Sequence, residues 1–508
     1  MNNVEAGGDI VRRDASPDDG PKEACGVFAV YAPDSPVAHL TYAGLYALQH
    51  RGQEAAGMAV SDGEQLFVVK DTGLVTHAFD ERRLGGLSGH LAIGHVRYST
   101  TGSSVWSNAQ PVFREANGVE FALGHNGNLV NTAELAADVG MLESTWGTDS
   151  DVMAEHLRRE LDGHGTSPSL ERALRVVLQR ARGAFSLVLL DQRAVYGVRD
   201  PHGFRPLCLG RLDSGWVMAS ETAALDIVGA TFIREVEPGE MVVIDEQGCR
   251  SVRLFPVDEA EPKLCLFEFV YFARPDSQLY GRNVHAARRR MGELLAAQAP
   301  LSSDPAGRDA MVMPVPESGI PAAQGFARAS GIPYGDGLTK NRYIGRTFIA
   351  PSQAMRQLGV RMKLNPLREN IAGKRLVVVD DSIVRGTTTR QIVAMLRAAG
   401  AAEVHLRVSS PPYKWPCFYG MDTNSPSELL AANLSFAEIV QYLGCDSLAY
   451  LELDRLVEAT GAKNAGFCTA CLSGEYPVAP PRRVGVAQSA LEIAAEVNVD
   501  DLQQLSWS

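Results

Sequence analysis

Long apolar runs are missing from this sequence, and none approaches the roughly 20 residues that a helix needs to cross a bilayer. Its first 24 residues also lack the apolar core of a secretory signal. Positive charge is not in excess, because 48 Lys and Arg stand against 60 Asp and Glu, for a net charge of −12. Proteins that bind nucleic acid carry a basic face. We therefore expect a cytoplasmic protein that binds neither membranes nor nucleic acid.

Cysteine is scarce as well, with eight residues in a chain of 508. Structural disulfides are rare in the cytoplasm, so these cysteines are expected to be catalytic, metal-bound or simply buried. The sequence has no internal repeat and no low-complexity tract. At about 150 residues per domain, its length predicts two to four domains. A content of 45% hydrophobic and 21% charged residues is ordinary for a globular protein.

The chain changes character near residue 255, which predicts two main domains between a leader and a tail. Residues 1–24 are polar and are predicted to be disordered. Residues 25–255 alternate short strand-like runs with Gly-rich turns, which predicts an α+β domain rich in antiparallel strands. Residues 256–485 contain strand–helix–strand units, which are typical of a parallel sheet. Residues 486–508 have helical periodicity and are predicted to form a C-terminal helical tail.

Local patterns predict the individual elements. Strands are predicted at 25–32, 55–60, 65–70, 91–96, 186–190, 216–220, 310–316, 375–381 and 404–410. Helices are predicted at 40–50, 283–299 and 388–400.

The sharpest motif is LVVVDDSIVRGTTT at residues 376–389. Asp380 and Asp381 end an apolar strand, where open α/β sheets bind their ligands. Gly386 lets the backbone approach a phosphate, and the free N–H groups of the following helix can donate to it, as can the hydroxyls of three threonines. These threonines are Thr387, Thr388 and Thr389. The acidic pair can accept from ribose hydroxyls or hold a hard divalent cation.

The alternative for this motif is an ordinary strand followed by a capped helix, with the aspartates solvated. The full string, however, resembles the fingerprint of the type I phosphoribosyltransferases, an α/β family with a parallel sheet. That resemblance implies binding of phosphoribosylpyrophosphate and Mg²⁺, with Arg385 among the residues that contact the substrate.

Cys25 follows the polar leader directly. Taken alone, a cysteine on a strand is usually a small buried hydrophobic residue. Five further motifs follow it in order. They are HRGQEAAG (50–57), GHVRYSTTG (94–102), GHNGNLVN (124–131), TDSDV (148–152) and RDPHGFRPL (199–207). Together they resemble the glutaminase domain of the N-terminal nucleophile hydrolases, which implies an α+β sandwich over most of residues 25–250.

The resemblance implies a nucleophile that carries its own base. Removal of residues 1–24 would give Cys25 a free α-amine, whose pKa of about 7.7–8.0 leaves part of it unprotonated at neutral pH. This amine can take the thiol proton, and the thiolate then attacks the side-chain amide of glutamine. Asn126 and the N–H of Gly127 match the oxyanion hole.

The same resemblance implies a pocket for the rest of the glutamine. Arg97 matches the residue that pairs with the substrate carboxylate, for which a planar guanidinium is suited. Asp151 matches the partner of the substrate α-amino group, and Arg51 and Gly52 match positions that shape the pocket.

Four cysteines look like a ligand set. Cys468 and Cys471 have the C-x-x-C spacing, and Cys265 and Cys417 would complete four thiolates. Spacing alone leaves zinc, an iron–sulfur cluster and a redox dithiol open. The flanking residues resemble the iron–sulfur class of the glutamine phosphoribosylpyrophosphate amidotransferase family, which implies one [4Fe–4S] cluster per subunit with a structural role. The remaining cysteines match no motif and are expected in the core, namely Cys208, Cys249 and Cys445.

Resemblance to this family extends over nearly the whole chain after residue 24. It implies one Mg²⁺ per subunit near Ser318, Asp380 and Asp381, and a mobile loop at 340–348 that closes over the substrate. The loop residues implied are Lys340, Tyr343 and Arg346.

The family also implies the reaction, in which ammonia from glutamine displaces pyrophosphate from phosphoribosylpyrophosphate. The products are 5-phosphoribosylamine, glutamate and pyrophosphate, and the step is the first committed one of purine synthesis. A homotetramer inhibited by purine nucleotides is implied as well. The alternatives are another glutamine amidotransferase, which makes glucosamine phosphate or asparagine, and a non-catalytic regulator that senses the ligand.

Overall fold

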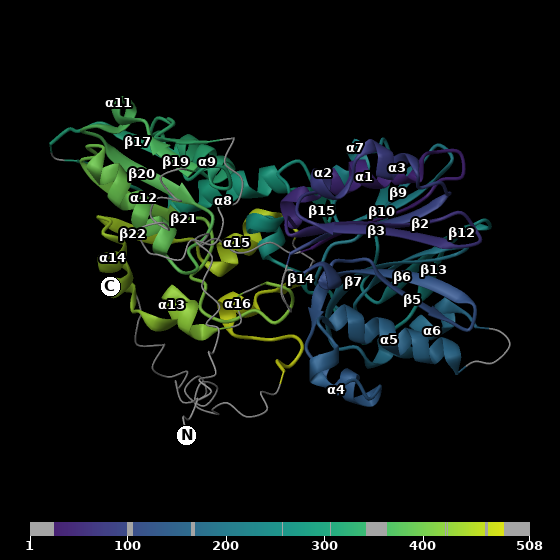
Figure 1. Ribbon diagram of the computed structural model, residues 1–508. Coiled ribbons are helices and arrows are strands. Elements are labelled where there is room, and N and C mark those ends of the chain that lie inside the picture. Colours follow the sequence, from purple (N-terminus) through teal and green to yellow (C-terminus); the bar gives the residue numbers. More distant parts are fainter. Residues whose placement is uncertain are drawn as a thin grey trace, which may run out of the picture.

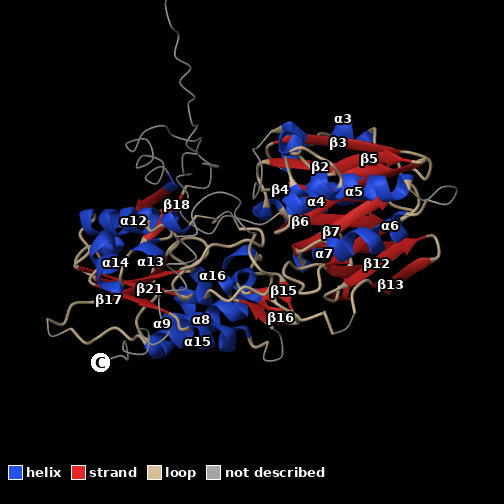
Figure 2. Ribbon diagram, turned by 90° about the horizontal axis from the view of Figure 1, so that it is seen from below, coloured by secondary structure: helices blue, strands red, loops and turns tan. Residues whose placement is uncertain are grey.

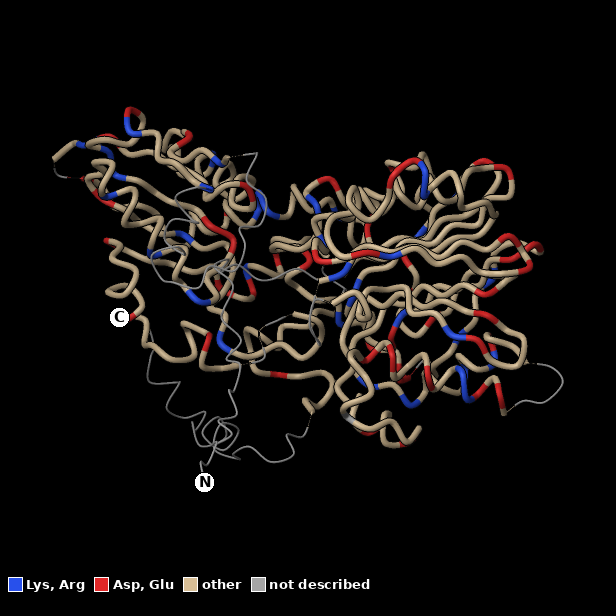
Figure 3. The backbone as a smooth tube through the Cα atoms, in the orientation of Figure 1, with Lys and Arg blue, Asp and Glu red and all other residues tan. Residues whose placement is uncertain are grey.

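The computed structural model describes residues 25–98, 105–163, 168–256, 258–304, 306–341, 363–421, 423, 425–462 and 466–481. The predicted leader (1–24) and helical tail (486–508) lie outside these residues, as do Tyr343 and Arg346 of the predicted loop. Two bodies stand side by side, the first half of the chain in purple to blue and the second in teal to yellow (Figure 1). Acidic and basic residues are interspersed along the backbone of both halves (Figure 3).

The first half is a sandwich of two antiparallel sheets. One sheet has the order β11-β9-β10-β1-β4-β2-β3. Its strands are β1 (Gly26–Tyr31), β2 (Ala55–Ser61), β3 (Leu66–Thr72), β4 (Leu91–Arg97), β9 (Cys208–Leu212), β10 (Gly215–Ala219) and β11 (Thr231–Glu235). The other has the order β13-β12-β8-β7-β6-β5. Its strands are β5 (Val112–Ala116), β6 (Val119–Leu129), β7 (Gly183–Asp191), β8 (Val195–Arg199), β12 (Glu240–Asp245) and β13 (Gly248–Arg253).

Three apolar layers hold this sandwich together. Side chains of both sheets meet in one buried cluster, in which Val27 and Ile93 of the first sheet pack with Val188 and Ile244 of the second. On the outer faces, α1 (Val37–Ala47) and α7 (Thr222–Ile227) cover the first sheet, and α5 (Asp149–Asp162) and α6 (Leu170–Val177) cover the second. Side chains alternate across a strand, so each sheet buries both of its faces. The predicted sandwich is confirmed.

The second half contains a four-stranded parallel sheet with the order β17-β20-β21-β22. Its strands are β17 (Ala310–Pro314), β20 (Arg375–Asp380), β21 (Glu403–Val408) and β22 (Ser447–Tyr450). Helices cover both faces (Figure 2). They are α8 (Val284–Gln298), α9 (Ile320–Ser330) and α15 (Leu453–Thr460) on one face and α12 (Thr387–Ala398) and α14 (Phe436–Leu443) on the other. The predicted parallel sheet is confirmed.

Shorter elements connect these layers. They are α2 (Val75–Ala78), α3 (Glu81–Gly85), α4 (Thr132–Asp138), α11 (Arg368–Ile371), α13 (Leu430–Asn433), α16 (Ala470–Ser473), and the turns η1 (Gln49–Arg51), η2 (Trp106–Asn108), η3 (Glu143–Thr145), η4 (Leu178–Arg180) and η6 (Pro426–Glu428). The paired strands are β15 (Gln278–Leu279) with β16 (Arg282–Asn283), and β18 (Leu338–Lys340) with β19 (Leu364–Pro366). Within the described ranges, no helix is long and apolar enough to span a bilayer.

The halves share a buried apolar cluster at their junction. Ala184 and Phe204 of the first half belong to the same cluster as Phe269 and Tyr419 of the second. The rings of Phe204 and Tyr419 stack with their centroids 4.5 Å apart. Nearby, β14 (Leu264–Cys265) pairs in parallel with β23 (Phe467–Cys468), and η5 (Glu268–Phe272) is a single turn of π-helix. The junction is therefore packed as a protein interior.

Candidate active site

Cys25 lies immediately before β1 and is 7% exposed. Its Sγ is 3.3 Å from the carbonyl O of Tyr98, and the Tyr98 N–H lies 3.4 Å from Sγ. Burial raises the pKa of the Cys25 thiol, although the Tyr98 hydrogen bond and the Arg97 charge oppose the rise. The thiol is therefore protonated at neutral pH and needs a base before it can act as a nucleophile.

Asn126 and Gly127, the predicted oxyanion-hole residues, lie on β6. Asn126 is fully buried, and within the described ranges neither its Nδ2 nor its Oδ1 has a hydrogen-bond partner. Gly127 has φ +153°, and a Cβ there would lie 2.0 Å from the carbonyl O of Ala184. A buried amide without a partner costs about 1–3 kcal/mol, which makes Asn126 a candidate for binding a ligand or a reacting group.

A histidine pair connects β6 to β4, the strand that ends beside Cys25. His95 Nε2 on β4 bonds to the carbonyl O of His125 on β6 at 3.0 Å, and β4 ends at Arg97, next to Tyr98. Burial lowers the pKa of His95 to about 3, so its ring is neutral. Cys25 and the part of β6 that carries Asn126 and Gly127 are thus held at the same end of the facing sheets.

His125 and Asp149 form a buried pair that the sequence motifs contained but did not single out. His125 Nδ1 is 3.5 Å from Asp149 Oδ1, and Asp149 Oδ2 accepts from the N–H of Leu129 at 3.0 Å. Burial works against the charged ring, but Asp149 outweighs it and the pKa of His125 is raised. Their positions beside Asn126 and Asp151 in GHNGNLVN and TDSDV were the available signal.

The predicted glutamine-pocket residues surround this end of the sandwich. Arg97 is buried, with Nη1 3.9 Å from Glu54 Oε2. Gly52 packs on it so closely that a Cβ would lie 2.6 Å from the Arg97 carbonyl C. Asp151, in the first turn of α5, has its Oδ1 3.5 Å from Arg114 Nη2.

Arg51 is occupied by protein groups. Its guanidinium pairs with Glu221 and Glu268, and its Nε donates to the carbonyl O of Cys25 at 3.1 Å. Arg51 therefore holds the main chain of Cys25, and its role in shaping the glutamine pocket stays a prediction.

The acidic pair lies at the carboxyl end of β20, as the motif predicted, and both carboxylates are buried. Burial, with the neighbouring Asp381 carboxylate, raises the pKa of Asp380 well above its ordinary value. Burial also raises that of Asp381, against a hydrogen bond from Ser318. Ser382 Oγ donates to Asp381 at 2.5 Å. Two buried carboxylates side by side form a site that a hard cation or hydrogen-bond donors would stabilise.

The predicted phosphate loop leads from β20 into α12. Gly386 is the N-cap of α12 with φ +78°, a conformation that glycine adopts readily. Thr389 is buried, whereas Thr387 is exposed. Arg385 Nε is 3.1 Å from Glu428 Oε2. The turn after β20 thus places these residues at the N-terminus of α12, where the partial positive charge of a helix favours an anion.

Lys340, the described member of the predicted mobile loop, is exposed on β18, and its Nζ lies 3.4 Å from Glu317 Oε2. Glu317 adjoins Ser318, so Lys340 lies at the loop that carries the third predicted magnesium position.

The four predicted cluster cysteines lie together. All are buried, Cys265 and Cys468 are in register on the β14–β23 pair, and the Cys471 carbonyl O accepts from the N–H groups at 414 and 415. Burial and the neighbouring Cys417 raise the pKa of Cys265 to about 11, although Arg205 opposes the rise. Burial followed by the other thiols raises that of Cys468 and Cys471. Within the described ranges, no three His, Cys, Asp or Glu side chains are grouped to hold a single metal ion.

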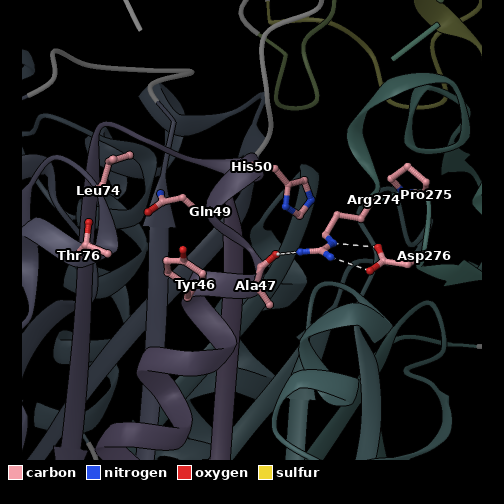
Figure 4. Close-up of a pocket in the computed structure, with 9 residues that line it drawn as sticks. All are labelled: Tyr46, Ala47, Gln49, His50, Leu74, Thr76, Arg274, Pro275 and Asp276. Atoms are coloured by element: carbon pink, nitrogen blue, oxygen red, sulfur yellow. Dashed lines mark hydrogen bonds and ion pairs between the residues drawn. The ribbon is translucent and has the colours of Figure 1, made fainter. Parts of the chain in front are cut away.

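A cavity of about 640 Å³ opens between η1 and the segment after η5. It is lined by Tyr46, Ala47, Gln49, His50, Leu74, Thr76, Arg274, Pro275 and Asp276. Arg274 spans it, with its guanidinium between the Ala47 carbonyl and the Asp276 carboxylate (Figure 4). None of the predicted site residues lines this cavity.

In the first half, a buried cysteine lies at the start of the first strand of a sandwich. In the second half, strand β20 of a parallel sheet ends at an acidic pair. This combination indicates a glutamine amidotransferase fused to a phosphoribosyltransferase. Family models agree, since a glutamine amidotransferase domain matches residues 95–226 and a phosphoribosyl transferase domain matches residues 288–428.

Whole-chain relatives narrow this class. The amidophosphoribosyltransferase of Mycobacterium tuberculosis is 54% identical over 486 residues, covering 93% of this chain and 90% of its own. That of Bacillus subtilis is 46% identical over 465 residues, covering 90% and 95%. The chain belongs to the amidophosphoribosyltransferase family.

Two solved structures have the same fold. One, described as the allosteric regulatory enzyme of purine biosynthesis, is 44% identical with a TM-score of 0.81 over 90% of this chain and 96% of its own. The other is the glutamine phosphoribosylpyrophosphate amidotransferase of Bacillus subtilis complexed with ADP and GMP, 43% identical with a TM-score of 0.81 over 90% and 98%. This protein transfers ammonia from glutamine to phosphoribosylpyrophosphate, the first step of purine biosynthesis.

Proposed function

We propose that Cys25 is the nucleophile of the glutaminase half-reaction, with Asn126 and Gly127 as the oxyanion hole. The main support is the fully buried side-chain amide of Asn126, which has no hydrogen-bond partner in the described part of the chain. Its Nδ2 and the Gly127 N–H can both donate to an oxyanion that forms when the thiolate attacks the glutamine amide. Arg97 and Asp151 then bind the carboxylate and the α-amino group of glutamine.

The base in this proposal is the α-amine of Cys25, freed by removal of residues 1–24. Burial holds the thiol protonated, so a proton acceptor must be close to it. The unprotonated amine takes the thiol proton as the sulfur attacks the amide carbon, and returns it to the leaving nitrogen when the C–N bond breaks and ammonia is released. Water then hydrolyses the thioester on Cys25, which gives glutamate and restores the thiol.

In the second half-reaction, we propose that Asp380 and Asp381 accept from the ribose hydroxyls while the first turn of α12 holds a phosphate, with Arg385 and Thr387–Thr389 around it. Mg²⁺ bound near Ser318 and the acidic pair would neutralise charge on the pyrophosphate. The paired buried carboxylates fit such a cation, because a positive charge would stabilise their ionised forms and so lower the pKa values that burial raises. Lys340, with Tyr343 and Arg346, would close over the substrate and exclude water.

We also propose that Cys265, Cys417, Cys468 and Cys471 hold a [4Fe–4S] cluster with a structural role. Four buried thiols that interact electrostatically fit a site at which thiolates are neutralised by iron. The Bacillus subtilis structure with ADP and GMP supports a further proposal, that purine nucleotides bind and inhibit this protein, as expected of a homotetrameric member of the family.

The decisive test is release of pyrophosphate by the purified chain. It should require both phosphoribosylpyrophosphate and a nitrogen source, glutamine or high ammonium. Binding of phosphoribosylpyrophosphate without any turnover would instead favour a ligand-sensing regulator.

A further inference from the structure

Four charged side chains meet at the junction between the halves and are almost fully buried. They are Arg51, Arg205, Glu221 and Glu268, each at most 1% exposed. Three come from the sandwich, whereas Glu268 comes from η5, which follows β14. With two guanidiniums and two carboxylates, the cluster is neutral. Removing one partner of such a cluster leaves an uncompensated buried charge, which strongly disturbs its neighbours.

Glu268 is the member that bridges the two arginines. Its Oε1 lies 2.7 Å from Arg51 Nη2 and 3.3 Å from Arg205 Nη1, and its Oε2 lies 3.0 Å from Arg51 Nη1. Glu221 also binds Arg51, but its remaining bonds go elsewhere, to His50, Ser277 and the N–H of Arg274. Within the cluster, only Glu268 bonds to both arginines.

Each arginine donates hydrogen bonds to a main-chain carbonyl next to the proposed glutaminase site. Arg51 Nε donates to the carbonyl O of Cys25 at 3.1 Å. Arg205 Nε and Nη2 donate to the carbonyl O of Tyr419 at 3.1 and 3.0 Å. The next residue, Gly420, is packed so tightly that a Cβ would lie 3.3 Å from the carbonyl C of Gly127.

A further bond fastens the loop around Tyr419 to the oxyanion strand. Asn128 Nδ2 on β6 donates to the carbonyl O of Phe418 at 3.0 Å. A single carboxylate from the second half therefore contacts both arginines, one of which donates to the Cys25 carbonyl and the other to the loop that packs on Gly127. Among the described residues, the side-chain partners of Glu268 are Arg51 and Arg205, and neither Arg97 nor Asp151 is one of them.

We propose that Glu268 is a positioning residue for glutamine cleavage, acting through Arg51 on Cys25 and through Arg205 on the support of Gly127. This inference rests on the proposed role of Cys25. A neutral side chain at 268 would leave the cluster with one excess positive charge, and Arg51 would turn toward Glu221. The Cys25 carbonyl would lose its fixed donor, and small misplacements of a nucleophile lower the rate of the chemical step more than substrate binding.

The experiment compares Glu268→Gln with Glu240→Gln in the full chain. Glu240 is 5% exposed and pairs with the partly exposed Arg234 at 2.7 Å, so it tests the loss of a buried carboxylate with an arginine partner elsewhere in the sandwich. For Glu268→Gln we expect glutamine-dependent kcat to fall about 10- to 100-fold, with the glutamine KM and the ammonia-dependent rate within about threefold of the parent. Alkylation of Cys25 by iodoacetamide, followed by peptide mass spectrometry, should slow. Glu240→Gln should match the parent in all four readouts.

Parent-like glutamine kcat in folded Glu268→Gln would overturn the proposal, as would an equal loss in Glu240→Gln. If Glu268→Gln does not fold, Glu268→Asp serves instead, because it keeps the charge but is too short to bridge both arginines. Its glutamine-dependent kcat should fall about threefold or more, and an unchanged kcat would overturn the proposal. Cys25→Ala run beside these variants separates the two proposals. Glutamine turnover without the thiol would refute the nucleophile, on which the positioning role depends, whereas loss of turnover in Cys25→Ala with parent-like glutamine kcat in Glu268→Gln would refute the positioning role alone.

Discussion

At the scale of single residues, the thiol of Cys25 and the acidic pair belong to different half-reactions in the proposed mechanism. Cys25→Ala should therefore abolish glutamine-dependent synthesis, by about 1,000-fold or more, because no other nucleophile replaces the thiolate. It should keep synthesis driven by high ammonium at raised pH, since ammonia held at the second site is already a competent nucleophile. Both rates are measured as pyrophosphate release. Loss of both in a folded variant would contradict two separable sites.

Asp380 and Asp381 should give a different pattern. Replacing both with Asn should abolish glutamine-dependent synthesis and ammonium-driven synthesis, because contacts to ribose hydroxyls and Mg²⁺ weaken. Cleavage of glutamine at Cys25 should continue. Burial raises the pKa of both carboxyls, so they favour folding at low pH and oppose it as pH rises through the raised values. The Asn variant should therefore gain melting temperature without Mg²⁺ at about pH 8, and less at about pH 5. Unchanged synthesis of phosphoribosylamine would refute the assignment.

At the scale of elements, the proposed iron–sulfur cluster concerns the β14–β23 pair, which carries two of its four cysteines. Anaerobically purified protein should be brown with about four irons per chain. Cys468→Ser should lose the colour and melt several degrees lower, because ligand loss removes a link between segments far apart in the chain. Cys445→Ser, at a buried cysteine in another apolar cluster, is the matched control and should stay brown. Stoichiometric zinc without iron would overturn the cluster assignment.

An element could be predicted from the sequence when residues close to it in the chain determine its conformation. The strand at β20 and the helix at α8 follow from apolar runs and periodicity, and both lie within a residue or two of the predicted ranges. The π-helical turn η5 and the two-residue strand β14 have no such pattern. Their conformation is fixed by distant partners, Arg51 for Glu268 and Cys468 for Cys265, which no local window contains.

The candidate site divides in the same way. Sequence motifs named Cys25, Asn126 and Gly127, which the structure places at one end of the facing sheets. The motifs did not reveal that Arg51 is held by Glu268, because the two are 217 positions apart and buried charge pairing is a property of the folded chain. The roles of the motif residues stay predictions until the variants are measured.

At the scale of the whole molecule, the junction contains an acid-sensitive contact. Burial opposes ionisation of Glu221, but His50 and Arg51 outweigh it and hold its pKa below the ordinary 4.5. Its stabilising effect is therefore complete above pH 4.5 and is lost as pH falls through the lowered value. Glu221→Gln should destabilise the protein by about 3 kcal/mol at neutral pH, and by less at about pH 3. Chemical denaturation at both pH values measures this, and a constant difference would contradict it.

The length of the active chain provides the last prediction. If the α-amine of Cys25 is the base, protein that turns over glutamine should begin at Cys25, with residues 1–24 removed. Intact mass and N-terminal sequencing decide the point. Full glutamine activity in a chain that still begins at Met1 would exclude the amine as base.

The stacked pair of Phe204 and Tyr419 has a consequence for how this protein could be divided or recombined. Because the apolar cluster around it draws residues from both halves, a gene cut near residue 255 would produce two fragments with exposed hydrophobic faces. Such fragments should aggregate or reassociate rather than work alone. Calorimetry of the intact chain should accordingly show one cooperative transition, and a chimaera with a foreign glutaminase would have to exchange both rings together.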